Sequence, residues 1–359
     1  MARKHAPNQS STDISAIVAS TAPDHANNFD ALRLAAAWMV MASHQYFFLG
    51  RAQPSPLGHT LGELAVMVFF ALSGYLVTES WYRDPHIVRF LLRRMLRIWP
   101  ALAAATLLIA LAGAALSTVP PGRYFGHDTV QFIIRNLQLR QAFHLPGVFD
   151  DMPGAAVNGS WWTIRLETKC YLYLGALGLL GLRRRWLSLL ALATCLVLFI
   201  RTLPGHAEAD AARNLYVLYA GFFFTGTCAW QYRTELVRAR RWGWLAIPAL
   251  LAAAFALRQP ALAEWALVPA TVFGIGARST PGLRAAGRFG DLSYGTYLYA
   301  FFVQQAVIRA WPGTSSLAGM LLVAMIGTSA IAWASWHVVE QPALRLKRQL
   351  RSWFPDHAP

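Results

Sequence analysis

Two residues of the first apolar stretch have types and spacing that suit chemistry. Arg33 and His44 are eleven positions apart. In an α-helix they would point the same way, about 16 Å apart along the axis. Ionisable side chains are costly in hydrocarbon unless they line a cavity or have a partner. The spacing therefore predicts a helix face that joins a guanidinium group to a deeper imidazole, and a hydrogen-bonded packing role is the plainer alternative for His44.

A carboxylate in a later apolar stretch could assist that imidazole. Glu167 lies about 10 Å below the outer end of its predicted helix, close to the depth predicted for His44. A neighbouring carboxylate can orient an imidazole and raise its basicity, as a general base for an alcohol requires. Tyr171, four residues later, shares the face of Glu167 and is expected to hydrogen-bond there. The plainer alternative is that Glu167 neutralises a buried cation.

A cluster of arginines suits a phosphate ligand. Arg93, Arg94 and Arg97 precede the Trp99-Pro100 pair that opens the third apolar stretch. Guanidinium groups match phosphate oxygens in geometry and charge, so the cluster predicts a site for a phosphorylated cofactor. A role in membrane topology alone is about equally compatible with these residues.

The composition indicates the elements that must position these groups. Hydrophobic residues make up 56% of the 359, charged residues only 14%, and the mean hydropathy is +0.36. A soluble domain averages about 25% charged residues, which disfavours a water-soluble enzyme. We therefore predict an all-α polytopic membrane protein with about ten transmembrane helices around a central cavity. The apolar runs are 29–50, 61–81, 99–118, 159–181, 186–203, 213–232, 243–258, 260–277, 291–311 and 316–336.

The charge distribution fixes the predicted orientation. The net charge is +15, and 21 of the 32 Lys and Arg residues fall in segments that are cytoplasmic if the amino terminus is inside. This asymmetry favours ten spans with both termini inside and contact with anionic lipids, and it argues against nucleic-acid binding. The predicted parts are a flexible cytoplasmic tail (1–28), a transmembrane domain (29–340) and a basic cytoplasmic tail (341–359). The longest outer segment, 119–158, is a candidate lid or acceptor-binding loop.

Metal and disulfide sites are not predicted. Cys170, Cys195 and Cys228 all lie in apolar runs, without the spacing of a zinc site or a disulfide framework. The pair Ser73-Gly74 is interpreted as a close helix contact and not as a nucleophile. No pattern in the sequence predicts an oligomeric state.

Taken in chain order, these motifs resemble the acyltransferase 3 family of integral-membrane O-acyltransferases. The resemblance covers about residues 28–345. It is carried by Phe29–Arg33 with His44, Phe69–Tyr75, Arg94–Pro100, Trp162–Glu167 with Tyr171, Ser293–Tyr299 and Glu340–Pro342.

The resemblance implies transfer of an acyl group, commonly acetyl from acetyl-CoA, to a hydroxyl of a cell-envelope glycan. Carried over by position, it makes His44 the catalytic histidine, with Arg33 as its partner. It also makes Arg94 and Arg97 a second arginine motif, and Glu167 with Tyr171 a fourth-span motif. The sequence departs from the family pattern at Met67, Lys169 and Ala300, and Ala300 replaces a frequent His. Gln304 and Gln305 could supply polar contacts in its place.

We therefore predict a membrane O-acyltransferase of the bacterial cytoplasmic membrane, with acyl-CoA as donor and no metal. The CoA phosphates would meet Arg93, Arg94 and Arg97, and the pantetheine arm would follow the helix face from Arg33 to His44. His44 would act as general base, or as a nucleophile that carries the acyl group. The acceptor would be a carbohydrate or a lipid-linked glycan.

Two other classes of function fit the same residues. A transporter of a lipid-linked sugar or small acid could use His44 and Glu167 as a proton relay. A catalytically silent scaffold is the third interpretation.

Overall fold

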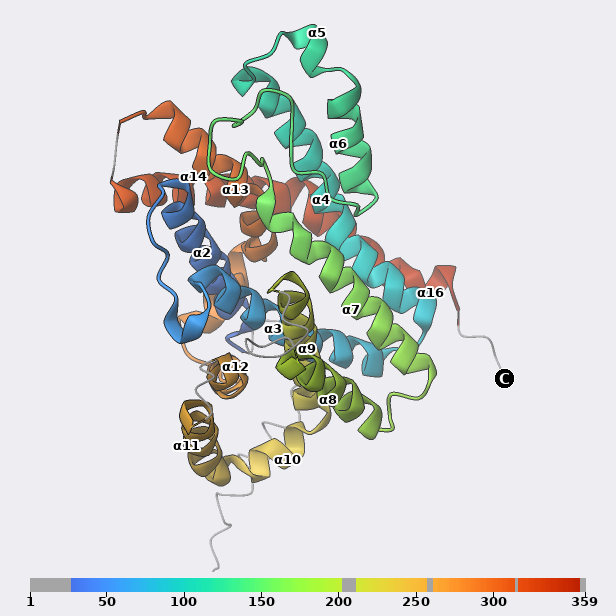
Figure 1. Ribbon diagram of the computed structural model, residues 1–359. Coiled ribbons are helices and arrows are strands. Elements are labelled where there is room, and N and C mark those ends of the chain that lie inside the picture. Colours follow the sequence, from blue (N-terminus) through green and yellow to red (C-terminus); the bar gives the residue numbers. More distant parts are fainter. Residues whose placement is uncertain (1–26, 202–210, 257–260, 314–315, 356–359) are drawn as a thin grey trace, which may run out of the picture.

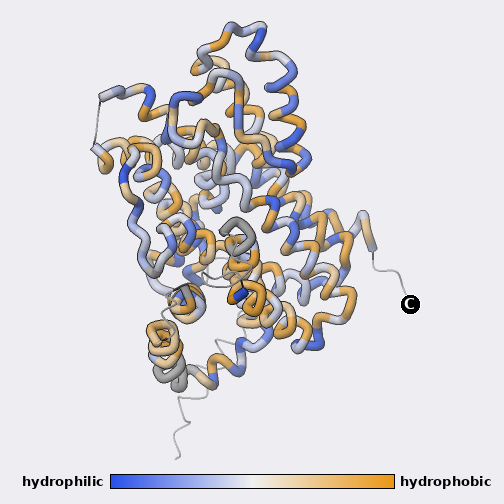
Figure 2. The backbone as a smooth tube through the Cα atoms, viewed as in Figure 1, coloured by the Kyte–Doolittle hydropathy of each residue, from blue (hydrophilic) through white to orange (hydrophobic). Residues whose placement is uncertain are grey.

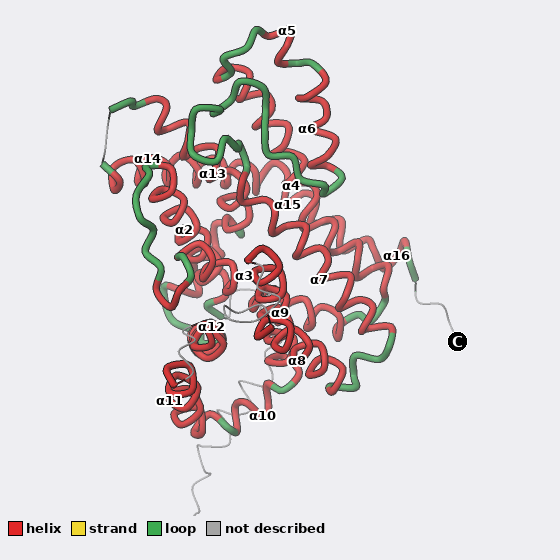
Figure 3. Tube along the Cα trace, viewed as in Figure 1, coloured by secondary structure: helices red, strands yellow, loops and turns green. Residues whose placement is uncertain are grey.

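The computed structural model describes residues 27–201, 211–256, 261–313 and 316–355. Within these ranges the chain is entirely helical, with no β-strand (Figures 1 and 3). The predicted tail 1–28 lies almost wholly outside the described residues. The all-α class is therefore confirmed for the described part of the chain.

Each of the ten apolar runs forms a helix. Three helical stretches, Leu61–Arg83, Ile87–Leu116 and Leu317–Trp353, are long and apolar enough to cross a membrane, and several others are shorter and apolar. The count of ten spans stays a prediction. The ten helices are α2 (Phe29–Phe48), α3 (Leu61–Arg83), α4 (Ile87–Leu116), α7 (Trp162–Leu179), α8 (Trp186–Arg201), α9 (Ala211–Gln231), α11 (Arg240–Ala256), α12 (Ala261–Gly276), α13 (Leu292–Ala310) and α14 (Leu317–Ser335).

Helix α4 begins twelve residues before the predicted run. The side chain of His86 accepts a hydrogen bond from the backbone of Arg89 and so caps the helix. Pro100 lies inside α4 without ending it. The apolar pattern did not predict this first part of α4 because it is rich in arginine. The arginine cluster therefore lies on a helix and not in the predicted loop.

The predicted outer segment 119–158 is partly helical. It contains α5 (Pro121–Tyr124) and α6 (His127–Leu137), which lie at the top of the view in Figure 1. The hydroxyl of Tyr124 donates to the carbonyl of Ala110 at 2.6 Å, and the Trp99 indole donates to the carbonyl of Leu137 at 3.0 Å. Hydrophilic residues gather on α6 (Figure 2). Its buried residues Thr129, Phe132 and Asn136 form the face that packs on α4, and the opposite face is exposed. Its role as a lid or acceptor-binding loop stays a prediction.

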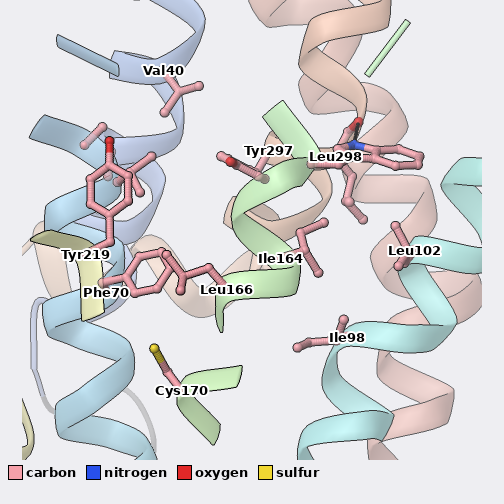
Figure 4. Packing of buried hydrophobic residues seen from close by; sticks show 14 of the residues in the cluster. Val40, Phe70, Ile98, Leu102, Ile164, Leu166, Cys170, Tyr219, Tyr297 and Leu298 are labelled. Atoms are coloured by element: carbon pink, nitrogen blue, oxygen red, sulfur yellow. Dashed lines mark hydrogen bonds between the residues drawn. The ribbon is translucent and has the colours of Figure 1, made fainter. Parts of the chain in front are cut away.

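The closest helix packing joins α3 and α9. A Cβ at Gly74 would lie 1.8 Å from the carbonyl oxygen of Phe223, and one at Gly226 would lie 2.0 Å from that of Ala71. Glycines permit such contact between backbones in membrane-type helix pairs. The main core then continues to α4, α7 and α13, where Leu102, Ile164 and Leu298 pack together with their neighbours (Figure 4).

The remaining elements are short. The predicted basic tail continues as helical turns up to Trp353 and returns to α4, where Arg89 donates to the carbonyl of Phe354 at 2.6 Å. Arg89 and Arg93 both pair with Asp84 in the loop before α4. Burial acts to raise the pKa of Asp84, but these two guanidinium groups lower it to about 2. The short elements are η1 (Pro56–Gly58), η2 (Gly159–Trp161), α10 (Arg233–Arg238), η3 (Leu283–Phe289), η4 (Trp336–Glu340), α15 (Gln341–Arg345), η5 (Leu346–Gln349) and α16 (Leu350–Trp353).

Candidate acyl-transfer site

A cavity of about 120 Å³ lies between α2, α3, α4, α7 and α13. It brings together Arg33, Arg94, Arg97, Glu167 and Tyr171 from distant parts of the sequence, whereas His44 and Arg93 do not line it. Its lining is mixed, with aromatic rings beside charged groups. The polar and ionisable lining residues are Arg33, Ser73, Arg94, Arg97, Thr163, Glu167, Tyr171, Ser293, Tyr294 and Tyr297.

Asp291 holds two of the three cavity arginines. Its carboxylate lies 3.2 Å from the Arg33 guanidinium and also forms an ion pair with Arg97. Arg33 has a second partner in Asp30 on its own helix. Asp291 caps α13 by accepting from the backbone of Ser293, so its carboxylate is fixed where α2, α4 and α13 meet. Sequence reasoning missed Asp291, although an acid directly before the tyrosine run was a usable signal.

Glu340 adds a further carboxylate near Arg97. The Glu340 side chain is 3% exposed, and its Oε2 lies 3.9 Å from the Arg97 guanidinium. The π-helical turn η4 carries it toward the cluster, where Ser335 donates to its Oε1 at 3.3 Å. Such turns often occur at functional sites. The motif that marks the end of the family resemblance is thus tied to the base of the cavity.

Arg94 is held differently from its neighbours. It donates to the Ser80 hydroxyl at 3.2 Å, and its guanidinium carbon lies 5.9 Å from the centre of the Tyr171 ring. Within the described ranges it has no ion pair with a carboxylate. Arg93 pairs with Asp84 and does not line the cavity. Arg94 is therefore the cavity cation best placed for an incoming anion.

Glu167 belongs to a hydrogen-bonded group with Ser73 and Tyr171. Ser73 donates to Glu167 Oε1 at 2.9 Å, Tyr171 donates to the same oxygen at 2.5 Å, and the two hydroxyls lie 3.1 Å apart. The predicted shared face of Glu167 and Tyr171 is confirmed. The two residues of the pair Ser73-Gly74 have different roles. Gly74 packs on α9 as predicted, and Ser73 lines the cavity.

Hydrogen bonds beside the cavity join α13 to the turn before α7. Tyr297 donates to the carbonyl of Ser160 at 2.6 Å, and its hydroxyl lies 2.6 Å from that of Thr163. The Trp161 indole donates to the carbonyl of Leu298 at 3.0 Å. These bonds explain why α7 begins at Trp162 and deep in the bundle, because the turn η2 is anchored on α13.

His44 lies outside this cavity. Its ring packs edge-on against Phe301, with the centroids 5.1 Å apart, and near Phe48 at 6.1 Å. Its Nδ1 is buried without a hydrogen-bond partner, whereas the residue as a whole is partly exposed. Gln304 of α13 donates to the side chain of Gln45, next to His44, at 2.8 Å. Gln304 thus contacts the residue after His44, and a role of Gln304 and Gln305 as polar contacts at the site stays a prediction.

The expected contact between His44 and Glu167 is absent from the structure. A Cβ at Gly62 would lie 3.1 Å from the Ser43 hydroxyl, so α2 beside His44 meets the outer end of α3. Glu167 bonds to Ser73, which lies eleven residues farther along α3 and therefore about 16 Å deeper. Matched depth failed because it assumed that α7 starts at the outer surface. The imidazole of His44 and the carboxylate of Glu167 therefore lie at different depths of the bundle.

The described residues offer no obvious metal centre. No group of three or more His, Cys, Asp or Glu side chains among them is placed to hold a metal ion.

Lys169, one of the departures from the family pattern, is exposed, and its ammonium group lies 6.0 Å from the centre of the Tyr216 ring. It therefore faces away from the cavity.

Comparison with known proteins identifies the family. The family model described as an acyltransferase domain, which defines acyltransferase 3, matches residues 27–337. The O-acetyl transferase of Shigella phage Sf6 is 30% identical over 88% of this chain and 95% of its own length. Nodulation protein 10 of Rhizobium leguminosarum bv. viciae is 31% identical over 91% of this chain and 95% of its own. Acyltransferase MdmB of Streptomyces mycarofaciens is 28% identical over 91% and 94%, respectively.

No solved structure matches the chain significantly. The match to the family model nonetheless spans almost the whole helical bundle and includes every residue that lines the cavity. The enzyme interpretation is therefore favoured over the transporter and the silent scaffold. The chain belongs to the acyltransferase 3 family and is an enzyme that transfers acyl groups.

Proposed function

We propose that this enzyme transfers an acyl group, most simply acetyl, from acyl-CoA to a hydroxyl of a cell-envelope sugar or polysaccharide in the bacterial cytoplasmic membrane. The observation that carries the proposal is the cavity itself, in which Arg94 has no ion pair with a carboxylate of the described residues while Arg33 and Arg97 both pair with Asp291. The similarity to a phage protein named O-acetyl transferase supports an oxygen acceptor.

The donor would enter through the part of the cavity that is lined by Arg33, Arg94 and Arg97, here called the arginine level. A phosphate group of CoA would bind Arg94, with Arg97 beside it, because a guanidinium group forms strong charge-assisted bonds to phosphate. Arg93 is held by Asp84, so its predicted part in donor binding would require exchange of that partner. Arg33 and Asp291 would keep Arg97 in place.

The donor's arm would then pass Glu167. Both hydrogen bonds to this carboxylate reach Oε1, and within the described part of the chain Oε2 has no bond from a protein group. Amide N–H groups of the pantetheine arm could therefore donate to Oε2, while Tyr171 and Ser73 hold the carboxylate in one orientation. This assigns Glu167 to donor positioning and replaces its expected role as the orienter of His44.

The acceptor would meet the thioester at His44. The imidazole would take the proton of the acceptor hydroxyl as its oxygen forms a bond to the acyl carbon. The carbon–sulfur bond would break, and the CoA thiolate would take the proton from the imidazolium. The buried Nδ1 without a partner is consistent with an imidazole that awaits a ligand. In the covalent variant, His44 would first carry the acyl group.

Mass spectrometry of envelope glycans tests the proposal. A deletion strain of the source bacterium should lose an O-acyl mass increment, and wild-type protein should restore it whereas His44→Ala should not. Unchanged glycans in the deletion strain would contradict a glycan acceptor. Labelled acyl-CoA without acceptor would distinguish the two chemical variants, since only the covalent one leaves label on His44.

A further inference from the structure

The imidazole of His44 borders a small apolar cluster that is separate from the main core. This cluster contains Phe48, Ala156 and Phe301, with Phe143 and Ile308 packed against it. Phe301 is 5% exposed, and its ring stands edge-on to both His44 and Phe48, with centroids 5.1 Å and 4.8 Å away. An acyl group presented to His44 would therefore have its hydrocarbon end in contact with this cluster.

Phe301 lies one helical turn from a residue that lines the cavity. It follows Tyr297, which lines the cavity, by four residues of α13, and so lies about one turn farther outward on nearly the same face. Its ring also meets Gly159, where an added Cβ would lie 2.6 Å from the ring. The ring thus fills the space bounded by the imidazole and the backbone of η2, and neither neighbour leaves room for it to move aside freely.

We propose that Phe301 sets the length of the acyl chain that this enzyme transfers, an inference that rests on the proposed function. With the thioester carbon at His44, the first carbons of the acyl chain lie where the phenyl ring closes the apolar cluster. An acetyl group ends before the ring, whereas each further methylene must displace it. Removing ring volume at 301 lengthens the chain that fits without altering the imidazole or the arginine level.

The test compares acyl-CoA donors of increasing length. Purified full-length protein in nanodiscs is given acetyl-, butyryl- or hexanoyl-CoA with envelope glycans extracted from the deletion strain, and kcat/KM is measured by acyl incorporation. One methylene in an apolar pocket changes specificity by about 10- to 200-fold. Phe301→Leu and Phe301→Ala should therefore raise the butyryl-to-acetyl ratio of kcat/KM at least about tenfold, and alanine should extend the gain to hexanoyl.

Phe302→Leu is the matched control. Phe302 is the next residue of α13, is 6% exposed, and packs against Phe149 of the outer segment at 5.5 Å. Phe302→Leu removes the same volume from the same helix as Phe301→Leu. The butyryl-to-acetyl ratio of kcat/KM should stay at the wild-type value in this variant. A general loosening of α13 would change the ratio in both variants and overturn the inference.

The two levels of failure are distinguishable. A wild-type enzyme that transfers acetyl, with an unchanged donor ratio in Phe301→Leu, overturns the role of Phe301 and leaves the proposed function standing. A wild-type enzyme that transfers no acyl group from any of the three donors overturns both. Phe301→Leu keeps an apolar side chain in the cluster, so the experiment remains decisive even where Phe301→Ala does not fold.

Discussion

Arg94 differs from the other cavity arginines in its electrostatic surroundings. Arg33 and Arg97 share Asp291, so much of their charge is already compensated, whereas Arg94 is held by a hydroxyl and an aromatic ring. Arg93, Arg94 and Arg97 look alike in the sequence. They differ in the structure because Asp84 pairs with Arg93 and Asp291 pairs with Arg97.

Arg94→Gln should weaken donor binding more than chemistry. Loss of a hydrogen bond to a charged group costs about 1.5–3 kcal/mol, so the KM for acetyl-CoA should rise about 10- to 150-fold with a smaller change in kcat. Arg83→Gln is the control, because its side chain is 67% exposed and pairs with Glu79 one turn earlier on α3. Steady-state kinetics with varied acetyl-CoA decide the matter, and equal KM values in both variants would exclude Arg94 as the anchor.

Tyr171→Phe should affect the enzyme through Glu167. The change removes one of two bonds to Glu167 Oε1 and leaves the Ser73 bond in place. We expect a roughly 3- to 30-fold loss of kcat/KM, because a typical hydrogen bond contributes about 0.5–1.5 kcal/mol and a charged acceptor more. Glu167→Gln should lose more than Tyr171→Phe when the two are compared in one acyl-CoA assay. The reverse order would show that the carboxylate charge is not used.

At the scale of helices, the contact between α3 and α9 fixes the wall that carries Ser73. Gly74→Ala would place a methyl group 1.8 Å from a backbone oxygen of α9, and the helices must separate. Overpacking typically costs about 1–3 kcal/mol, so the unfolding temperature in detergent should fall by several degrees. Gly274→Ala on α12 is the control, since its added methyl would meet nothing within 4 Å. Similar unfolding temperatures for the two variants would contradict this packing.

A loop on the opposite end of α3 carries a titratable bridge. His59 Nδ1 lies 3.3 Å from Glu63, and Nε2 lies 3.6 Å from the fully buried Glu264 of α12. Burial acts to lower the pKa of His59, but the hydrogen bond with Glu63 and the two nearby carboxylates outweigh it and raise the pKa above 6.5. The loop before α3 is thereby tied to α12 by a charge that depends on pH.

The sign of the resulting pH dependence follows from linkage. A group whose pKa rises on folding adds stability below its unfolded pKa of about 6.5, and that stability is lost as the pH rises through the folded pKa. The unfolding temperature of the wild type should therefore decline with pH above 6.5, and the decline should be shallower in His59→Asn. Parallel curves for the two proteins would show that this bridge is not formed.

Over the whole molecule, the sequence predicted the helices better than their levels. Apolar runs located all ten helices because hydrophobic length is a local property. The arginine-rich first part of α4 and the amphipathic α6 were missed because their polar residues resemble loop residues. The depth of Glu167 depended on where η2 is anchored, and that is decided by bonds from Tyr297 and Trp161 across the bundle.

The sequence predicted only part of the site, because local spacing does not reveal contacts between distant helices. Helical spacing correctly placed Tyr171 beside Glu167, since both lie on one helix. It could not reveal that Asp291 binds Arg33 and Arg97, because these partners come from three separate helices and are brought together only by tertiary packing. The roles of His44, Arg93 and the outer segment stay predictions.

The most direct measurement is transfer of labelled acetyl from acetyl-CoA by purified protein in proteoliposomes that contain envelope glycans of the deletion strain. The account predicts label in the glycan with the wild type, at least about a hundredfold less with His44→Ala, and normal folding of both by unfolding temperature. Full transfer by a folded His44→Ala variant would contradict it.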